Sequence, residues 1–69
     1  MKYTEVKERF MNGESIQNFF GIRKNTYTIG KDGISSLQYD KIRDEFEGKH
    51  EHKVLGGGYT KHILTYKPE

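Results

Sequence analysis

The absence of cysteine from a chain of 69 residues is the feature that most limits its fold. Neither a disulfide nor a cysteine-bound metal can hold the chain together, and a domain of this size buries only about 60% of the surface that its unfolded chain exposes. Its core must come from the 32% of residues that are hydrophobic, which include five Tyr and four Phe. Because one aromatic ring can bury about 150–250 Å², we expect a single domain over residues 1–69 with a small, aromatic core.

The strongest helix signal covers residues 35–47. Ser35 and Gln38 have the spacing of a capping box, and the hydrophobic residues Ile34 and Tyr39 have the spacing of a hydrophobic staple. A helix here places three apolar side chains on one face, Tyr39, Ile42 and Phe46.

The first half of the chain predicts two further helices and a strand. Residues 4–12 have the apolar spacing of a helix, and Ser15 and Gly21 can begin and end a short second helix between them. Residues 25–30 alternate Thr with Tyr and Ile, which indicates a half-buried strand.

The C-terminal part predicts a β-hairpin. Residues 50–55 and 59–66 flank three glycines, and a loop made of those glycines places Lys53 opposite Lys61. Two directly opposed lysines are unfavourable, so either an anion lies between them or the loop is longer. Together these elements predict an α+β domain of winged-helix type, with about three helices and a three-stranded antiparallel sheet or C-terminal hairpin.

Acidic and basic residues are unevenly distributed along a nearly neutral chain. Twelve Lys and Arg against ten Asp and Glu leave a formal net charge of +2, which by itself does not indicate nucleic-acid binding. Residues 35–47 hold four acidic and two basic residues, whereas residues 21–33 and 48–67 together hold seven basic and two acidic ones. Such asymmetry is typical of an electrostatic footprint, and an ordinary surface of mixed charge is the plain alternative.

The basic segments make a small DNA-binding regulatory domain the leading functional hypothesis. Residues 15–27 have the order of a helix-turn-helix, with a short helix, a glycine turn and a basic segment. Lysines of the hairpin would bind phosphates, and a tyrosine at its end would stack on a base. The candidate nucleic-acid-binding residues are Arg23, Lys24, Lys31, Lys53, Tyr59 and Lys61.

A protein-binding module, or an inhibitor of a partner enzyme, is the alternative, of the kind that phages and plasmids encode as accessory proteins. Exposed aromatic side chains are typical interface anchors, and an acidic helix could dock on a basic partner. The candidate partner-binding residues are Phe20, Tyr59, Asp40, Asp44 and Glu47. A homodimer is a third alternative, because the edges of a sheet are open to pairing.

Other chemistry has little support in the sequence. His50, His52 and His62 could converge across the hairpin, but no carboxylate is supplied to the same face, so we expect no metal and no cofactor. The glycine-rich stretch 56–61 precedes a strand, unlike a phosphate-binding loop. The serines are best explained as helix caps, and so small a chain leaves little room for a substrate pocket. We therefore expect no enzymatic activity.

The hydrophobic pattern also bears on location. A transmembrane helix needs about 18 consecutive apolar residues, and no apolar run in this chain approaches that length. Residues 1–5 lead into a polar segment rather than the apolar centre of a signal peptide. We therefore expect a cytoplasmic protein without membrane contact.

Overall fold

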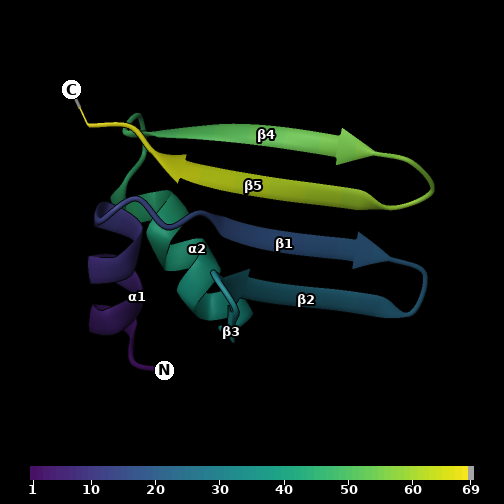
Figure 1. The fold of residues 1–69 in the computed structure, drawn as a ribbon, viewed down its shortest axis with the longest axis horizontal. Coiled ribbons are helices and arrows are strands. Elements are labelled where there is room, and N and C mark those ends of the chain that lie inside the picture. Colours follow the sequence, from purple (N-terminus) through teal and green to yellow (C-terminus); the bar gives the residue numbers. More distant parts are fainter. Residues whose placement is uncertain (69) are drawn as a thin grey trace.

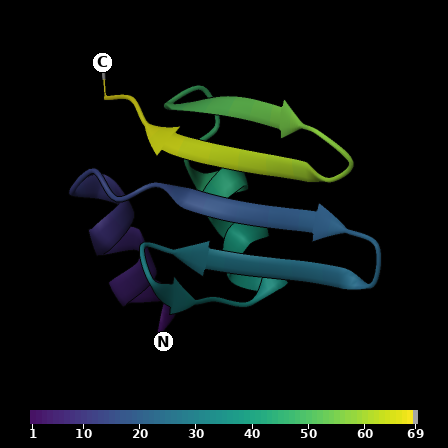
Figure 2. The ribbon, with the colours of Figure 1, turned by 45° about the vertical axis from the view of Figure 1, so that its right-hand side comes forward.

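The computed structural model describes residues 1–68 and contains two helices and five strands. In chain order they are α1 (Tyr3–Met11), β1 (Ile16–Gly21), β2 (Lys24–Ile29), β3 (Asp32–Gly33), α2 (Ser36–Glu45), β4 (His50–Gly56) and β5 (Thr60–Tyr66). The strands form one sheet in the order β3-β2-β1-β5-β4, with all neighbours antiparallel. Both helices lie at one end of the sheet, and two long hairpins project away from them (Figure 1). Figure 2 shows the helices behind the strands, on a single face.

The core lies between the two helices and one half of the sheet. Ile16 of β1 lies opposite Ile29 of β2 and Leu64 of β5, so these three side chains share the face that the helices cover. All three are fully buried. The helices contribute Val6, Phe10, Tyr39, Ile42 and Phe46. The core is therefore small and largely aromatic and aliphatic, as the composition predicts.

The capping box that the sequence predicts is present at the start of α2. The Ser35 hydroxyl accepts a hydrogen bond from the backbone N–H of Gln38 at 3.2 Å, and the Gln38 side chain accepts one from the backbone N–H of Ser35 at 3.0 Å. Tyr39, Ile42 and Phe46 are buried, as their spacing predicts. The predicted helix over residues 35–47 is confirmed in type, and it is shorter by one residue at its start and two at its end.

An arginine ties α1 to the turn between β2 and β3. Arg9 donates from Nε and Nη2 to the two carboxylate oxygens of Glu14, each at 2.6 Å, and from Nη1 to Asp32 at 2.6 Å. Gly30 lies next to the Arg9 and Glu14 side chains and has a φ of 59°, and a Cβ there would stand 2.8 Å from Glu14 Oε1. The Arg9 hydrogen bond lowers the pKa of Glu14. The left-handed backbone favours glycine at position 30, and a Cβ there would also displace the ends of the Arg9 and Glu14 side chains.

The segment predicted as a short helix after Ser15 is instead the central strand β1. Ile16 and Asn18 are buried on the helix side, whereas Phe19 points to the other side, which is the alternation of a strand. A helix of six residues forms few hydrogen bonds to offset the cost of its nucleation and depends on tertiary packing. In contrast, β1 forms hydrogen-bonded ladders with β2 and β5 at once.

The predicted α+β class is correct, but the predicted winged-helix architecture is wrong. The structure has two helices and a five-stranded antiparallel sheet, not three helices and a three-stranded sheet, and it is not winged-helix-like. Residues 15–27 form the β1–β2 hairpin, so no helix-turn-helix exists there. The strand predicted at residues 25–30 is confirmed as β2, one residue earlier, and the C-terminal hairpin is confirmed as β4 and β5.

The register of the C-terminal hairpin also differs from the prediction. Lys61 lies opposite Leu55, and Lys53 lies opposite Ile63, because Gly56 continues β4 and the loop comprises residues 57–59. Gly57 and Gly58 have positive φ, which suits them to the loop. This register avoids the direct opposition of two lysines and still places both on one face of the sheet.

Candidate functional site

One face of the sheet is covered by no helix, and we call it the open face. Successive residues of a strand point to opposite faces. Since Ile16, Ile29 and Leu64 point toward the helices, the registers assign the alternate residues to the open face. From β4 across to β2 they are Glu51, Lys53, Leu55, Thr65, Ile63, Lys61, Gln17, Phe19, Gly21, Thr28, Thr26 and Lys24.

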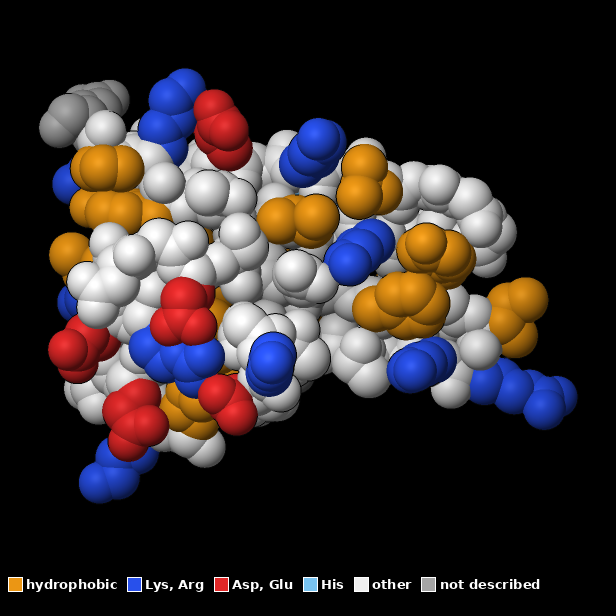
Figure 3. Space-filling model, viewed as in Figure 1, with side chains coloured by type: hydrophobic (Ala, Val, Ile, Leu, Met, Phe, Trp, Pro, Cys, Tyr) orange, Lys and Arg blue, Asp and Glu red, His pale blue; other side chains and the backbone are white. Residues whose placement is uncertain are grey.

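The open face carries a net positive charge. Lys24, Lys61 and Lys53 lie on three different strands, and Glu51 is the one acidic residue in the set. Glu51 is paired with Lys67 at 3.2 Å, so its charge is locally balanced. Figure 3 views the molecule from this side and shows Lys and Arg side chains interspersed with hydrophobic ones over the strands, with most acidic side chains gathered near the end that carries α1.

An aromatic pair lies among these lysines. The rings of Phe19 and Tyr59 are stacked, with centroids 4.7 Å apart and planes at 30°. Lys24 Nζ stands 5.6 Å from the centroid of the Phe19 ring, a cation–π contact. Gly21 lets the Phe19 ring lie close to the strand, because a Cβ there would stand 3.1 Å from Phe19 Cε1. The Tyr59 residue is 46% exposed, so the pair is available to a ligand.

The acidic residues of the candidate partner-binding set lie on the opposite layer. Asp40 and Asp44 belong to α2, and Glu47 follows its end. All three are exposed, and none makes an ion pair within 4.0 Å to another residue of 1–68. In contrast, Glu45 pairs with Lys7 at 2.5 Å, and this contact lowers the pKa of Glu45. These free acids therefore lie away from the lysines of the open face, in a helix layer that also carries the basic residues Lys41 and Arg43.

The structure brings together four of the six candidate nucleic-acid-binding residues. Lys24, Lys53 and Lys61 lie on the open face, and Tyr59 lies beside it in the β4–β5 loop. Arg23 lies at the far end of β2, in the β1–β2 turn. Lys31 lies at the other end of β2, apart from the rest.

Phe19 belongs to this candidate site but is not among the candidate residues that the sequence indicates. A helix over residues 15–20 assigned its ring to a buried helix face. Had the segment been read as a strand, the period of two would have placed Phe19 on the same face as Lys61 and Lys24.

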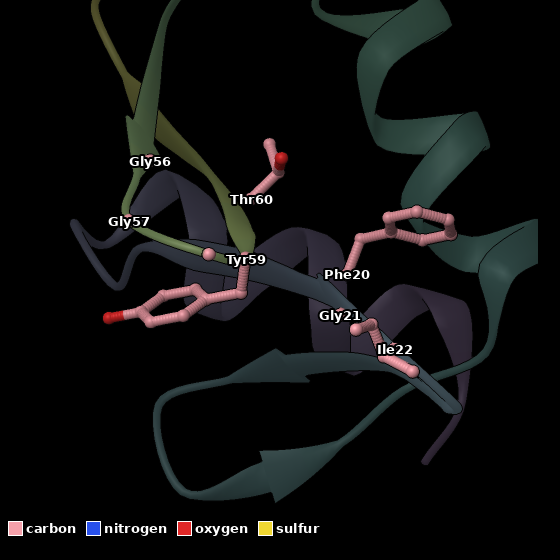
Figure 4. Close-up of a pocket in the computed structure, with 8 residues that line it drawn as sticks. Phe20, Gly21, Ile22, Gly56, Gly57, Tyr59 and Thr60 are labelled. Atoms are coloured by element: carbon pink, nitrogen blue, oxygen red, sulfur yellow. The ribbon is translucent and has the colours of Figure 1, made fainter.

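A shallow cleft lies between the ends of the two hairpins. It has a volume of about 540 Å³ and is lined by Phe20, Ile22, Tyr59, Thr60 and several glycines. Figure 4 shows Phe20 and Thr60 pointing to one side of the sheet and the Tyr59 ring to the other. Phe20 is 57% exposed on the helix side, beyond the reach of the helices.

The histidines meet only in part. His52 Nε2 and His62 Nδ1 share a hydrogen bond of 2.9 Å with stacked rings, whereas His50 bonds to the carbonyl of Phe46. Burial, and then the neighbouring His62, lower the pKa of His52. Over residues 1–68, no group of three or more His, Cys, Asp or Glu side chains is placed to hold a metal ion. The predicted opposition of His52 and His62 is wrong, since the two are diagonal neighbours.

Comparisons with protein-family models, with curated proteins and with solved structures found no match to this chain. Within residues 1–68, neither helix has the length and apolar character needed to cross a membrane.

Proposed function

We propose that this protein is a small, non-catalytic DNA-binding domain that contacts its ligand through the open face of the sheet. The observation that carries the proposal is the composition of the open face: three lysines from three strands lie on the same face as an aromatic pair, and the one acidic residue of that face is paired with Lys67.

The chemistry of the open face fits a nucleic acid. Lysine side chains bind phosphates as point charges, which positions the ligand and makes affinity depend on salt. Aromatic rings and uncharged polar groups such as Gln17 and Thr26 can contact bases. A non-catalytic protein of this kind acts by occupying a site on the DNA, which is a regulatory role. The proposal agrees with the cytoplasmic location expected from the sequence.

The test is the affinity for fluorescein-labelled DNA of a triple variant, K24A/K53A/K61A. We expect a loss of at least tenfold in affinity at low salt. The slope of the logarithm of the binding constant against the logarithm of the salt concentration is negative, and we expect its magnitude to fall by about 2. The matched control is K2A/K41A/K49A, which removes the same charge from positions outside the strands. Equal losses in the two variants would show that only net charge matters and would remove the open face as the site.

A protein-binding function is the second candidate, favoured by the free acids of α2 and by the exposed ring of Phe20. On that account, neutralising Asp40, Asp44 and Glu47 weakens capture of a basic partner and leaves the fold intact. The edge strand β4 is largely exposed along its length and offers a place for a second copy. Sedimentation of the protein at several concentrations tests for such a dimer.

A further inference from the structure

We propose that the open face binds single-stranded rather than duplex nucleic acid, with bases stacked on the Phe19–Tyr59 pair. This inference rests on the proposed function and specifies its ligand. Two independent observations carry it, the width of the sheet and the position of the aromatic pair.

The open face is too wide for the groove of a duplex. The four long strands, β2, β1, β5 and β4, are neighbours in the sheet, and at about 4.8 Å between neighbours their outer axes are about 14 Å apart. The major groove of B-DNA is about 12 Å wide and is filled by one helix or a two-stranded ribbon. The full open face therefore cannot enter the groove of a duplex, whereas a single-stranded nucleic acid can lie across the open face.

The aromatic pair is placed for stacking on unpaired bases. Phe19 and Tyr59 stack with each other on the face itself, with Lys24 beside Phe19 and Lys61 directly across the ladder from it. In a duplex, the faces of internal bases are covered by their neighbours, so the rings could reach only the backbone. In a single strand, base faces are free, and stacking on aromatic side chains combines with lysine contacts to the backbone.

The ends of the two hairpins offer an alternative way of binding, in which a hairpin enters the groove of a duplex. Each long hairpin is a two-stranded ribbon, and Arg23 lies in the turn of the β1–β2 hairpin. Such a ribbon could enter a groove, and Arg23 rather than Phe19 would then carry the binding. The two modes therefore depend on different residues, which makes them separable by mutation.

The experiment compares a labelled single strand of about 15 nucleotides of mixed sequence with its duplex, and with an RNA strand of the same sequence, at 50 and 200 mM salt. We expect at least one single strand to bind at least tenfold more tightly than the duplex. F19L and Y59L should each weaken single-strand binding about tenfold, in line with the loss of one stacked base. L37A is the control, since Leu37 is an exposed apolar residue of α2 in the other layer, and we expect it to bind as the unchanged protein does.

The possible failures are distinct. If the duplex binds as tightly as the single strands, and R23A weakens it while F19L does not, the single-strand inference is overturned and the proposed function stands. If no nucleic acid binds at 50 mM salt, the proposed function itself fails. Circular dichroism of each variant checks that it is folded, and Y59L, which changes an exposed loop residue, keeps the test decisive if F19L does not fold.

Discussion

At the scale of single residues, the geometry of the candidate site depends on a glycine. The Phe19 ring occupies the space above Gly21 and reaches Tyr59 from there. Gly21 does not have positive φ, so its absent side chain, not its backbone freedom, is what the site uses.

The substitution G21A should therefore displace the Phe19 ring. We expect it to be less stable than G56A by about 1 kcal/mol, because the new Cβ crowds the ring while both variants gain similarly from a stiffer unfolded chain. Gly56 is a fair control, since it lies in a strand without positive φ and a Cβ there meets nothing within 4 Å. Urea denaturation measures the difference, and equal stability of the two variants would contradict the contact.

The His52–His62 pair makes stability sensitive to mild acid. Because the folded pKa of His52 lies below its usual value, the unfolded chain binds more protons below about pH 6.5. The contribution of His52 to the free energy of unfolding is therefore complete above about pH 6.5. It decreases as the pH falls toward the pKa of His52 in the folded protein. We expect a lower urea midpoint at pH 5.0 than at pH 7.5.

H62Q provides the comparison for the histidine pair. Removing the neighbouring imidazole should raise the pKa of His52 in the folded protein and reduce the loss of stability between the two pH values. Burial would remain as the larger cause of the lowered pKa of His52, so the loss of stability at low pH should be reduced rather than abolished. An unchanged pKa of His52, followed by NMR in H62Q, would show that the pair is not coupled.

At the scale of elements, the segments that were predicted correctly are those with local signals. α2 has its capping box within four residues, and β5 follows two glycines whose positive φ fixes the loop. β1 has no such signal, because Ile16, Phe19 and Phe20 suit one face of a helix as well as alternate faces of a strand. Its identity is decided by ladders with β2 and β5, and its partners in β5 lie 40 to 48 residues away along the chain. The register of the C-terminal hairpin differs from the prediction for another reason, because Gly56 continues β4 and the loop begins one residue later.

The cap of α2 gives a prediction at this scale. We expect S35A to lower the free energy of unfolding by about 1 kcal/mol, because it leaves the backbone N–H of Gln38 without its acceptor. S36A is the matched control, since Ser36 is the first residue inside the helix and its side chain is not part of the capping box. Thermal or urea unfolding compares the two variants, and equal losses would mean that the cap contributes nothing specific.

At the scale of the whole molecule, the fold separates two kinds of surface. The sheet projects beyond the helices (Figure 1), and its open face presents lysines and aromatic rings. Asp40, Asp44 and Glu47 lie in or just after α2, in the other layer. From the sequence, the uneven distribution of charge was visible, and so were the lysines of β4 and β5. Lys24 was already among the candidate residues, but that it shares one face with Phe19 and these lysines could not be predicted, because this follows from the order β2-β1-β5-β4 in the sheet.

The most direct test of the open face as a nucleic-acid interface is an NMR titration of isotope-labelled protein with a short single-stranded DNA at low and at moderate salt. We predict that amide shifts concentrate in β1, β2, β4 and β5 around Lys24, Phe19, Lys53, Lys61 and Tyr59, and that they weaken steeply with salt. The amides around Asp40 and Asp44 on α2 should remain unchanged. Shifts centred on α2, or no shifts at low salt, would contradict the assignment of the open face.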